Sequence, residues 1–362
     1  MLRKSAISIT KTGFITLLGA VLLYILPLLT GCGKIFSLKR IVKVGASVAL
    51  AADHGTLFYA FDTLARPGEK ISLRARVISI DEMEDIEDAT VEFVLKDKSL
   101  GVVRTDDEGY ATLKWRAPEV EGDYLIKVRI IDVPSNKFKE ALKVAPASLL
   151  VAVRAEQTPF IVIDLDHTVV DSSFFSVLLG KAKPMKGAAK TIKELNRHYS
   201  LIYLTHRPEL LANKSKNWLN KNGFVRAPLL VSSLRQAIGS SAKFKATRLK
   251  NLRQKFPNIC IGIGDKFEDV QAYLDNDMVA YLIPHYDKND DDDLRKMIRK
   301  ISKLDKSVQV VETWKEIRAG ILQGEKFTPA EFVRKLRIRL EHLKRTKEKE
   351  KKKHKDDDAD DD

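Results

Sequence analysis

The stretch Phe160-Ile161-Val162-Ile163-Asp164-Leu165-Asp166-His167-Thr168 decides how this sequence folds. Its first four residues form a continuous apolar run, as expected of a parallel strand that is buried on both faces. Two carboxylates follow, at Asp164 and Asp166, where packing gains nothing from them and charge repulsion opposes their proximity. Because hard divalent cations prefer carboxylate oxygens, the pattern indicates either a polar turn after a strand or a metal site.

Strands and helices alternate along residues 158–307. The predicted strands are 160–163, 201–204, 229–231, 259–263 and 278–283, and the predicted helices are 187–198, 208–220, 243–256 and 268–274. This alternation predicts a doubly wound, Rossmann-like parallel α/β sheet with helices on both faces. Ligands bind such sheets at the carboxyl ends of the strands, which is where Asp164, Thr205 and Asp265 lie in the sequence.

Four short motifs occur in order along this region. Asp164 to Thr168 reads Asp-x-Asp-x-Thr, Thr205 ends the second strand, Lys245 lies in a predicted helix, and Asp269 follows Gly264-Asp265 after three residues. Together they resemble the motifs of the haloacid dehalogenase (HAD) superfamily of phosphotransferases, over residues 160–284. Lys243 competes with Lys245 for the third motif.

A narrower resemblance favours Lys245 over Lys243. Phe244-Lys245 and the apolar residues after it resemble the matching segment of lipin-type and actin-patch-type phosphatidate phosphatases. Tyr203-Leu204-Thr205 is similar to the second motif of the same families. Their first motif often carries Gly or Asp where this chain has His167, so the sequence departs from them at that position.

The superfamily resemblance implies a mechanism and a cofactor. Asp164 would be the nucleophile that forms an aspartyl-phosphate, and Asp166 the acid and then the base. The resemblance implies Mg²⁺ bound by Asp164, Asp265 and the backbone carbonyl of Asp166. Thr205 would donate a hydrogen bond to a phosphoryl oxygen, with the Lys245 ammonium beside it.

Three further residues near these motifs are candidates for supporting roles. Asp269 would orient Lys245 or a metal-bound water. His206 and Arg207 follow Thr205 directly, so they would either contact the substrate or lie at the surface before a helix. Cys260 lies in a predicted buried strand and is interpreted as an inert core residue.

Residues 39–153 predict a second, all-β domain. Short runs rich in β-branched residues recur between turn sequences, at 41–50, 71–80, 90–95, 110–115, 124–131 and 148–153. This spacing is typical of an immunoglobulin-like sandwich, and residues 105–112 resemble hairpins of bacterial immunoglobulin-like and transthyretin-like modules. We find no catalytic constellation in this part of the sequence, and interpret it as a spacer or docking module.

The first 32 residues predict a membrane tether. Basic residues precede an apolar run from Gly13 to Leu29, and Leu29-Thr30-Gly31-Cys32 resembles the lipobox of bacterial lipoproteins, in which the Cys is lipidated. The alternative is an uncleaved membrane anchor. Both place the bulk of the chain outside the cytoplasm, in the bacterial cell envelope. With only Cys32 and Cys260, a disulfide framework is excluded.

The C-terminal part is strongly charged. Residues 308–346 predict a helical segment in which Phe332, Leu336, Leu340 and Leu343 recur at helical spacing. Such a helix would either lie on an anionic membrane or pack on the α/β domain. Residues 347–362 predict a disordered tail. The net charge of +14 favours anionic partners. We do not predict nucleic-acid binding, because the tail lacks the aromatic residues expected for it.

The sequence therefore favours a membrane-tethered, Mg²⁺-dependent phosphomonoester hydrolase. Neither 171–190 nor 205–245 has room for the large cap that usually closes HAD sites over small substrates. An open site suits a phosphorylated substrate that is large, such as phosphatidate or another lipid phosphate. The alternative is a catalytically weak or inactive binding protein that recognises phosphorylated lipid or another anion.

Overall fold

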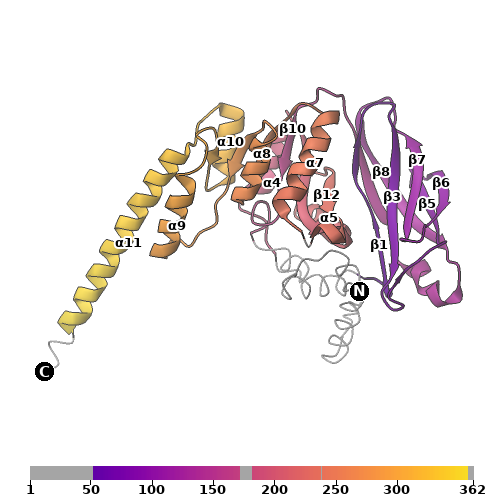
Figure 1. The fold of residues 1–362 in the computed structure, drawn as a ribbon, viewed down its shortest axis with the longest axis horizontal. Helices are drawn as coiled ribbons and strands as arrows, with labels where there is room; N and C mark the ends of the chain where they lie inside the picture. Colours follow the sequence, from indigo (N-terminus) through magenta and orange to yellow (C-terminus); the bar gives the residue numbers. More distant parts are fainter. Residues whose placement is uncertain (1–51, 172–181, 238, 358–362) are drawn as a thin grey trace.

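The computed structural model describes residues 52–171, 182–237 and 239–357. The predicted signal segment with Cys32 and the predicted strand at 41–50 lie outside these described residues. Within them, no helix has both the length and the apolar composition that a membrane crossing requires. The described chain forms a β-sandwich, an α/β domain and a long C-terminal helix, arranged in a row (Figure 1).

The sandwich consists of two sheets, as the sequence predicted. One contains β1 (Thr56–Ala60), β3 (Lys70–Ser79), β4 (Glu84–Asp85) and β7 (Tyr110–Arg116). The other has the order β2 (Thr63–Ala65), β9 (Ala147–Val153), β8 (Gly122–Asp132), β5 (Thr90–Leu95) and β6 (Lys98–Arg104), with the 3₁₀ helix η1 at Asn136–Lys143. Alternating inward side chains such as Val91, Phe93, Ile126 and Val128 fill the core between the sheets.

The α/β domain is built on a parallel sheet of six strands. Their order is β12 (Leu229–Ser232), β11 (Ser200–Pro208), β10 (Phe160–Ile163), β13 (Ile259–Gly264), β14 (Val279–Leu282) and β15 (Gln309–Val310). The chain therefore starts in the middle, builds the sheet outward on one side, and then crosses back to build the other. The resulting switch point lies between β10 and β13, where the fold class places its ligands.

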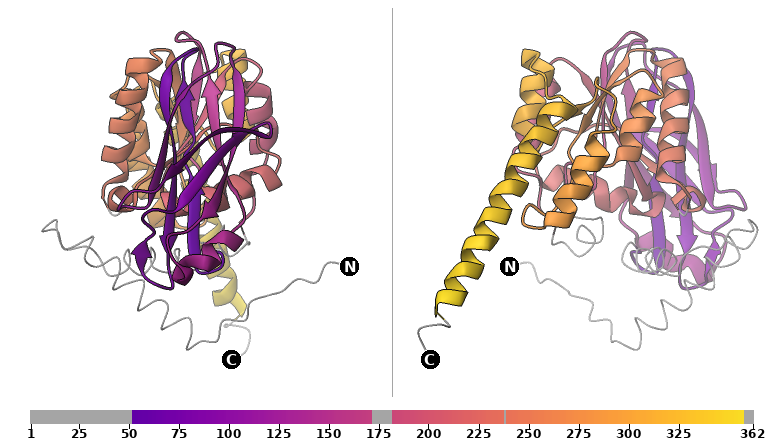
Figure 2. Two further views of the ribbon diagram at one scale, coloured as in Figure 1. Left: turned by 90° about the vertical axis from the view of Figure 1, so that its right-hand side faces the viewer. Right: turned by 60° about the vertical axis from the view of Figure 1, so that its left-hand side comes forward.

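Helices cover both faces of this sheet (Figure 2). One face packs against α4 (Ala188–Leu195), α5 (Ala212–Lys221) and α10 (Trp314–Gln323), and the other against α7 (Ser241–Lys255) and α8 (Phe267–Leu274). The apolar run of β10 explains this arrangement, because Ile161 and Ile163 enter the first layer while Phe160 and Val162 enter the second. All four side chains are almost completely buried.

Two predictions for the C-terminal part need correction. Strand β15 and helix α10 complete the α/β domain beyond residue 307, and a strand of two residues is too short to give a periodic signal. Helix α11 runs from Pro329 to Asp357, whereas we predicted disorder from residue 347. Lys and Glu favour helix, and extending an existing helix adds one hydrogen bond for each residue fixed.

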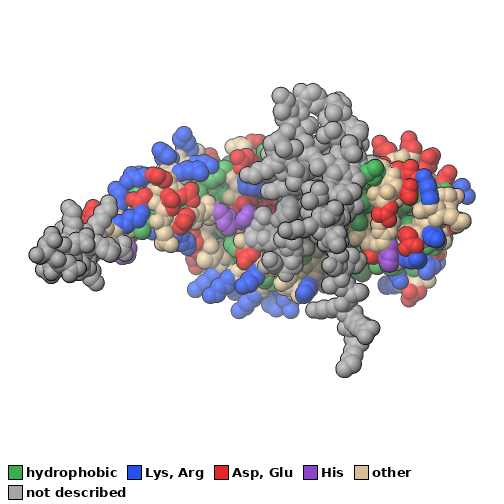
Figure 3. Space-filling model, turned by 90° about the horizontal axis from the view of Figure 1, so that it is seen from below, with side chains coloured by type: hydrophobic (Ala, Val, Ile, Leu, Met, Phe, Trp, Pro, Cys, Tyr) green, Lys and Arg blue, Asp and Glu red, His purple; other side chains and the backbone are tan. Residues whose placement is uncertain are grey.

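Helix α11 packs on the α/β domain along its first half. Phe332, Leu336 and Leu340, predicted from their spacing, are buried, and the helix lies beside α9 (Asp291–Ile301). The Thr328 hydroxyl accepts from the Glu331 backbone at 3.3 Å while the Glu331 carboxylate accepts from the Thr328 backbone at 3.1 Å. This reciprocal capping fixes the start of the helix. On the face shown in Figure 3, Lys and Arg side chains gather along both edges of the left-hand part of the molecule.

Candidate active site

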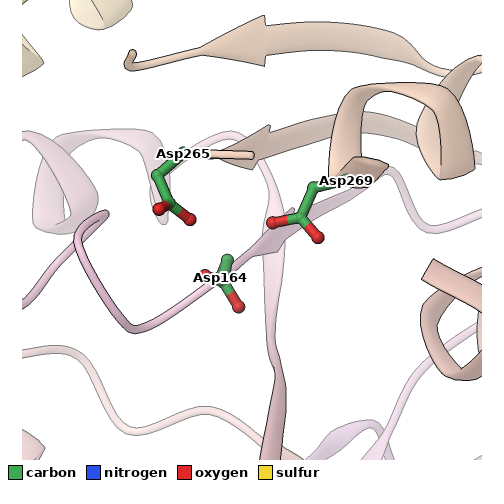
Figure 4. Close-up of side chains that lie close together, drawn as sticks. All are labelled: Asp164, Asp265 and Asp269. Atoms are coloured by element: carbon green, nitrogen blue, oxygen red, sulfur yellow. The ribbon is translucent and has the colours of Figure 1, made fainter. Parts of the chain in front are cut away.

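Three carboxylates converge at the carboxyl edge of the parallel sheet (Figure 4). Asp164 directly follows β10, Asp265 directly follows β13, and Asp269 lies in the first turn of α8. One oxygen atom from each lies within 4.8 Å of those from the other two. Because parallel strands end at the same edge, residues far apart in the sequence meet at the switch point.

One ammonium group lies among these carboxylates. Lys245 of α7 is fully buried, and its Nζ lies 2.7 Å from Asp164 Oδ1 and 2.8 Å from Asp269 Oδ2. Burial disfavours the charged ammonium, but the carboxylates of Asp164 and Asp269 outweigh this effect and raise the pKa of Lys245. Lys245, rather than Lys243, is therefore the lysine of this site. We call Asp164, Asp265, Asp269 and Lys245 the carboxylate cluster.

When all three of its carboxyl groups are ionised, the carboxylate cluster carries more negative charge than the Lys245 ammonium balances. Asp164 Oδ2, Asp265 Oδ1 and Asp269 Oδ1 are buried without a hydrogen-bond partner. Burial, followed by the nearby Asp164, raises the pKa of Asp265 to about 8. Buried polar atoms without partners are costly in a folded protein. A cation bound by oxygen would relieve this cost, so the residues present fit a divalent metal ion.

The second carboxylate of the first motif makes a different contact. The Arg207 guanidinium binds Asp166 at both oxygens, with Nη2 2.6 Å from Oδ1 and Nε 3.1 Å from Oδ2. Arg207 also donates to the Ser215 hydroxyl at 2.9 Å, and only 3% of the residue is exposed. Its side chain is thus committed to Asp166, whereas the sequence suggested contact with substrate or a surface position.

Thr205 lies in an irregular stretch of β11. The register between β11 and β12 shifts between Leu204 and Pro208, as in a β-bulge, a feature that often re-aims side chains beside active sites. Thr205 is buried, and its hydroxyl accepts from the Arg207 backbone at 3.3 Å, which leaves its proton free for donation. His206 contacts the Gln236 carbonyl at 2.8 Å and lies against the Phe244 ring.

Backbone conformation accounts for the unusual first motif. His167 adopts φ of 57°, in the left-handed region that glycine enters most easily and that His tolerates better than most residues. Its carbonyl lies 2.7 Å from His285 Nε2, which fixes this turn from outside the motif. Trp314 of α10 donates to the Thr168 carbonyl at 2.9 Å and secures the end of the same loop.

Sequence reasoning missed several of these contributors. Lys266 adds a cation whose pKa is raised because Asp164 and Asp265 outweigh the effect of burial. Its place between Asp265 and Asp269 could have marked it as a candidate residue of the site. The sequence did not show, however, that its ammonium lies near these carboxylates. Trp314 and Ser232 lie far from the motifs along the chain. Only the fold reveals that they contact the backbone of the first and second motif loops.

The site carries no large cap in the described part of the chain. Between β11 and α7 the described residues form only η2 (Glu209–Leu211), α5, β12 and the short helix α6 (Leu234–Ala237). The other insertion point predicted from the sequence includes residues 172–181, which lie outside the described residues.

Comparison with known protein families agrees with this site. Residues 161–282 match the family model described as the LNS2 domain of PITM 1-3. This region is similar to an LNS2 domain. It contains every residue of the carboxylate cluster together with Asp166, Thr205 and Arg207. No curated protein sequence matches the chain.

One set of solved structures is similar to the α/β domain, and another is similar to the sandwich. A D,D-heptose 1,7-bisphosphate phosphatase from B. bronchiseptica, crystallised with magnesium and phosphate, is 17% identical, with a TM-score of 0.37 over 46% of this chain and 99% of that chain. The D00-D0 domain of Intimin is 19% identical, with a TM-score of 0.19 over 26% of this chain and 45% of that chain.

Proposed function

We propose that this protein is a Mg²⁺-dependent phosphomonoester hydrolase that forms an aspartyl-phosphate on Asp164. One observation carries the proposal: three buried carboxylates converge beside a buried lysine at the switch point, with unpartnered oxygens on each. Each unpartnered buried oxygen costs folding free energy, and a bound cation would give these oxygens the partner that they lack.

Asp164, Asp265 and Asp269 are the residues that would hold the metal ion. A bound Mg²⁺ would supply positive charge that neutralises the phosphoryl oxygens and reduces their repulsion of the attacking carboxylate. Lys245 fixes Asp164 and Asp269 in place through its two ion pairs. Lys266 adds a further positive charge near Asp164 and Asp265, which favours an anionic substrate.

In the first step, the Asp164 carboxylate would attack phosphorus. An O–P bond to Asp164 forms while the bond from phosphorus to the leaving oxygen breaks, and Asp166 gives its proton to that oxygen. The Thr205 hydroxyl would donate to a phosphoryl oxygen. The two contacts of the Arg207 guanidinium with Asp166 would fix the orientation of this carboxyl group.

In the second step, water would replace Asp164 on phosphorus. Asp166, now a carboxylate, accepts a proton from the water, whose oxygen bonds to phosphorus while the bond to Asp164 breaks. Inorganic phosphate leaves and Asp164 returns to a carboxylate. The two carboxylates of the first motif therefore divide the work, one as nucleophile and one as acid and base.

A lipid phosphate is the substrate class that we favour. The described residues between β11 and α7 add no domain that would close over a small molecule. The resemblance of the second and third motifs to phosphatidate phosphatases points the same way. The net charge of +14 would draw the protein to an anionic surface, an effect that salt weakens.

The test measures phosphate release with and without Mg²⁺ from p-nitrophenyl phosphate and from phosphatidate vesicles. We expect Mg²⁺-dependent release by the parent protein and none by Asp164→Asn. Asp305→Asn, a change in an exposed turn, is the matched control and should retain full activity. If the parent protein releases no phosphate but binds the vesicles, the alternative of an inactive binding protein is correct. Faster turnover of sugar phosphates or nucleotides would contradict the lipid assignment.

We also propose that Cys32 carries a lipid that tethers the protein to a bacterial envelope membrane. The support is the sequence of residues 1–32 alone. Cys32→Ser should block lipidation and processing, and mass spectrometry of the mature protein measures both. An unlipidated, unprocessed parent protein would favour a membrane-spanning anchor instead.

A further inference from the structure

We propose that the β-sandwich holds the acid-base residue Asp166 in its working orientation, through the segment Arg207-Pro208-Glu209. The sandwich would then be part of the catalytic unit, whereas the sequence suggested a spacer or docking module. This inference rests on the proposed function and deepens it, because it adds positioning residues to the same site.

The segment presents two buried side chains in different directions. Arg207 binds the Asp166 carboxylate, and its exposed fraction is 3%. Glu209, two residues later, contacts the sandwich: its Oε1 lies 3.1 Å from Arg76 Nη1 of β3 and 3.4 Å from the Tyr59 hydroxyl of β1. Glu209 is 4% exposed, so solvent competes little for either contact.

Arg76 is a firm anchor for Glu209 because its guanidinium is bound on every side. Its Nε donates to the Glu108 carbonyl at 3.0 Å, and its Nη2 to Asp85 Oδ1 at 3.0 Å. The same group lies over the Tyr110 ring, 4.7 Å from its centroid. These contacts fix the position of the planar Arg76 guanidinium, so Glu209 can bind it only at one place.

The backbone between Arg207 and Glu209 is equally constrained. The Ser232 hydroxyl contacts the carbonyls of His206 and Arg207 at 3.1 and 3.0 Å. Pro208 has φ of −63°, the value that its ring imposes. If Glu209 moves, Arg207 should therefore move with it, because only Pro208, whose φ is fixed, lies between them.

The other partner of Arg207 is also tied to the sandwich. Ser215, which accepts from Arg207, lies on α5 between Asn213 and Lys216. Asn213 donates to the Phe58 carbonyl of β1 at 2.7 Å. Lys216 donates to the Ala60 carbonyl of β1 at 3.0 Å and pairs with Asp62 at 2.7 Å, and all these acceptors belong to the sandwich. The two sides of Arg207 thus depend on the same sheet of the sandwich, Glu209 through β3 and β1 and Ser215 through α5 and β1.

This arrangement makes a prediction that depends on the leaving group. An ester whose leaving group is a poor one needs the proton of Asp166, whereas a good leaving group departs with little help. Loosening Arg207 should therefore slow hydrolysis of phenyl phosphate more than that of p-nitrophenyl phosphate, which has nearly the same shape. Simple loss of folded protein would slow both equally.

The experiment compares Glu209→Gln with Glu69→Gln in the full chain. Glu69 of the sandwich pairs with Lys255 of α7 at 2.6 Å, so its change removes an ion pair between the same two domains without touching Arg207. For Glu209→Gln we expect kcat on phenyl phosphate to fall about tenfold, and that on p-nitrophenyl phosphate to fall far less, with KM unchanged. Glu69→Gln should leave both esters unaffected.

Hydrogen exchange gives a second readout that needs no activity. Peptides covering residues 204–209 should exchange faster in Glu209→Gln than in the parent protein. Their exchange in Glu69→Gln should equal that of the parent. Equal loss on both esters, or unchanged exchange in Glu209→Gln, would overturn the positioning role. If the parent protein hydrolyses neither ester, the proposed function fails, and hydrogen exchange alone decides whether the sandwich controls this segment.

Discussion

Two groups of buried charges in this molecule solve the same problem differently. The interface cluster, which consists of Tyr59, Arg76, Asp85 and Glu209, surrounds one guanidinium with two carboxylates and a hydroxyl. None of its side-chain atoms is buried without a partner. The carboxylate cluster pairs one ammonium with two of its three carboxylates and leaves an oxygen unpartnered on each of the three.

The unpartnered oxygens distinguish the two clusters: the interface cluster has none, as expected of a structural contact, whereas the carboxylate cluster has them, as expected of a ligand site. Burial raises the pKa of Glu209, and the Arg76 guanidinium partly offsets this rise. In the carboxylate cluster, burial and Asp164 together raise the pKa of Asp265 to about 8, and the cations of Lys266 and Lys245 offset only part of this rise. Every buried polar atom of the interface cluster has a partner in the folded protein, whereas the carboxylate cluster keeps unpartnered oxygens that could hold a metal ion.

The largest expected effect tests catalysis against structure. Asp166→Asn should lower kcat on phenyl phosphate by roughly 10²-fold or more, because the amide cannot transfer the proton. The thermal midpoint should also fall, because the amide offers Arg207 one acceptor oxygen in place of two and removes its counter-charge, so kcat is compared at a temperature where both proteins are folded. Steady-state kinetics and thermal unfolding of the same sample check both expectations, and preserved turnover would remove Asp166 from the mechanism.

A second prediction compares the central cation of each cluster. Lys245→Met and Arg76→Met should each lower the free energy of unfolding by about 3 to 5 kcal/mol, because each leaves buried carboxylates uncompensated. Mg²⁺ should restore much of the loss in Lys245→Met, where it can balance the same charges, and none in Arg76→Met. Denaturant unfolding with Mg²⁺ or with chelator measures this. Equal rescue of both variants would show that the two clusters do not differ as described.

A third prediction concerns pH. The pKa of Asp265 in the folded protein, about 8, lies well above the ordinary value of an aspartate, so the metal-free folded state binds this proton more tightly than the unfolded state does. Its contribution to stability is therefore present at low pH and lost as pH rises toward 8. Thermal midpoints in chelator should fall over this range in the parent protein relative to Asp265→Asn.

Magnesium should reverse this pH dependence. Because the metal needs the Asp265 carboxylate, its apparent affinity should rise as pH increases toward 8. Isothermal titration at several pH values would measure the rise and the accompanying proton release. A metal affinity that does not change with pH would place Asp265 outside the metal site.

The smallest expected effect calibrates the interface between the domains. Lys255→Met removes the ion pair with Glu69, in which both side chains are about one quarter exposed. It should lower the free energy of unfolding by only about 1 kcal/mol or less, because solvent screens such pairs. A loss as large as that of Arg76→Met would mean that burial does not explain the strength of the interface cluster.

The candidate site was predictable because its chemistry lies next to recognisable strands. The apolar run of β10 with Asp164 and Asp166, and Gly264-Asp265 after β13, identified the site edge. The spacing also placed β5 and β7 close to where the structure has them, whereas β11 extends four residues beyond its predicted end. By contrast, β1 and β15 gave no clear signal, since the first is nearly uniformly buried and the second is two residues long.

The α/β alternation, the sandwich and the residues at the carboxyl edge could be predicted from the sequence, because they follow from local periodicity and from residues adjacent to strands. The contacts of Arg207 with Asp166, of Glu209 with Arg76 and of Trp314 with the first motif are visible only in the folded protein. These pairs are 41, 133 and 146 residues apart along the chain. No local pattern encodes such contacts, because they form only where packing of the two domains and the layers brings distant side chains together.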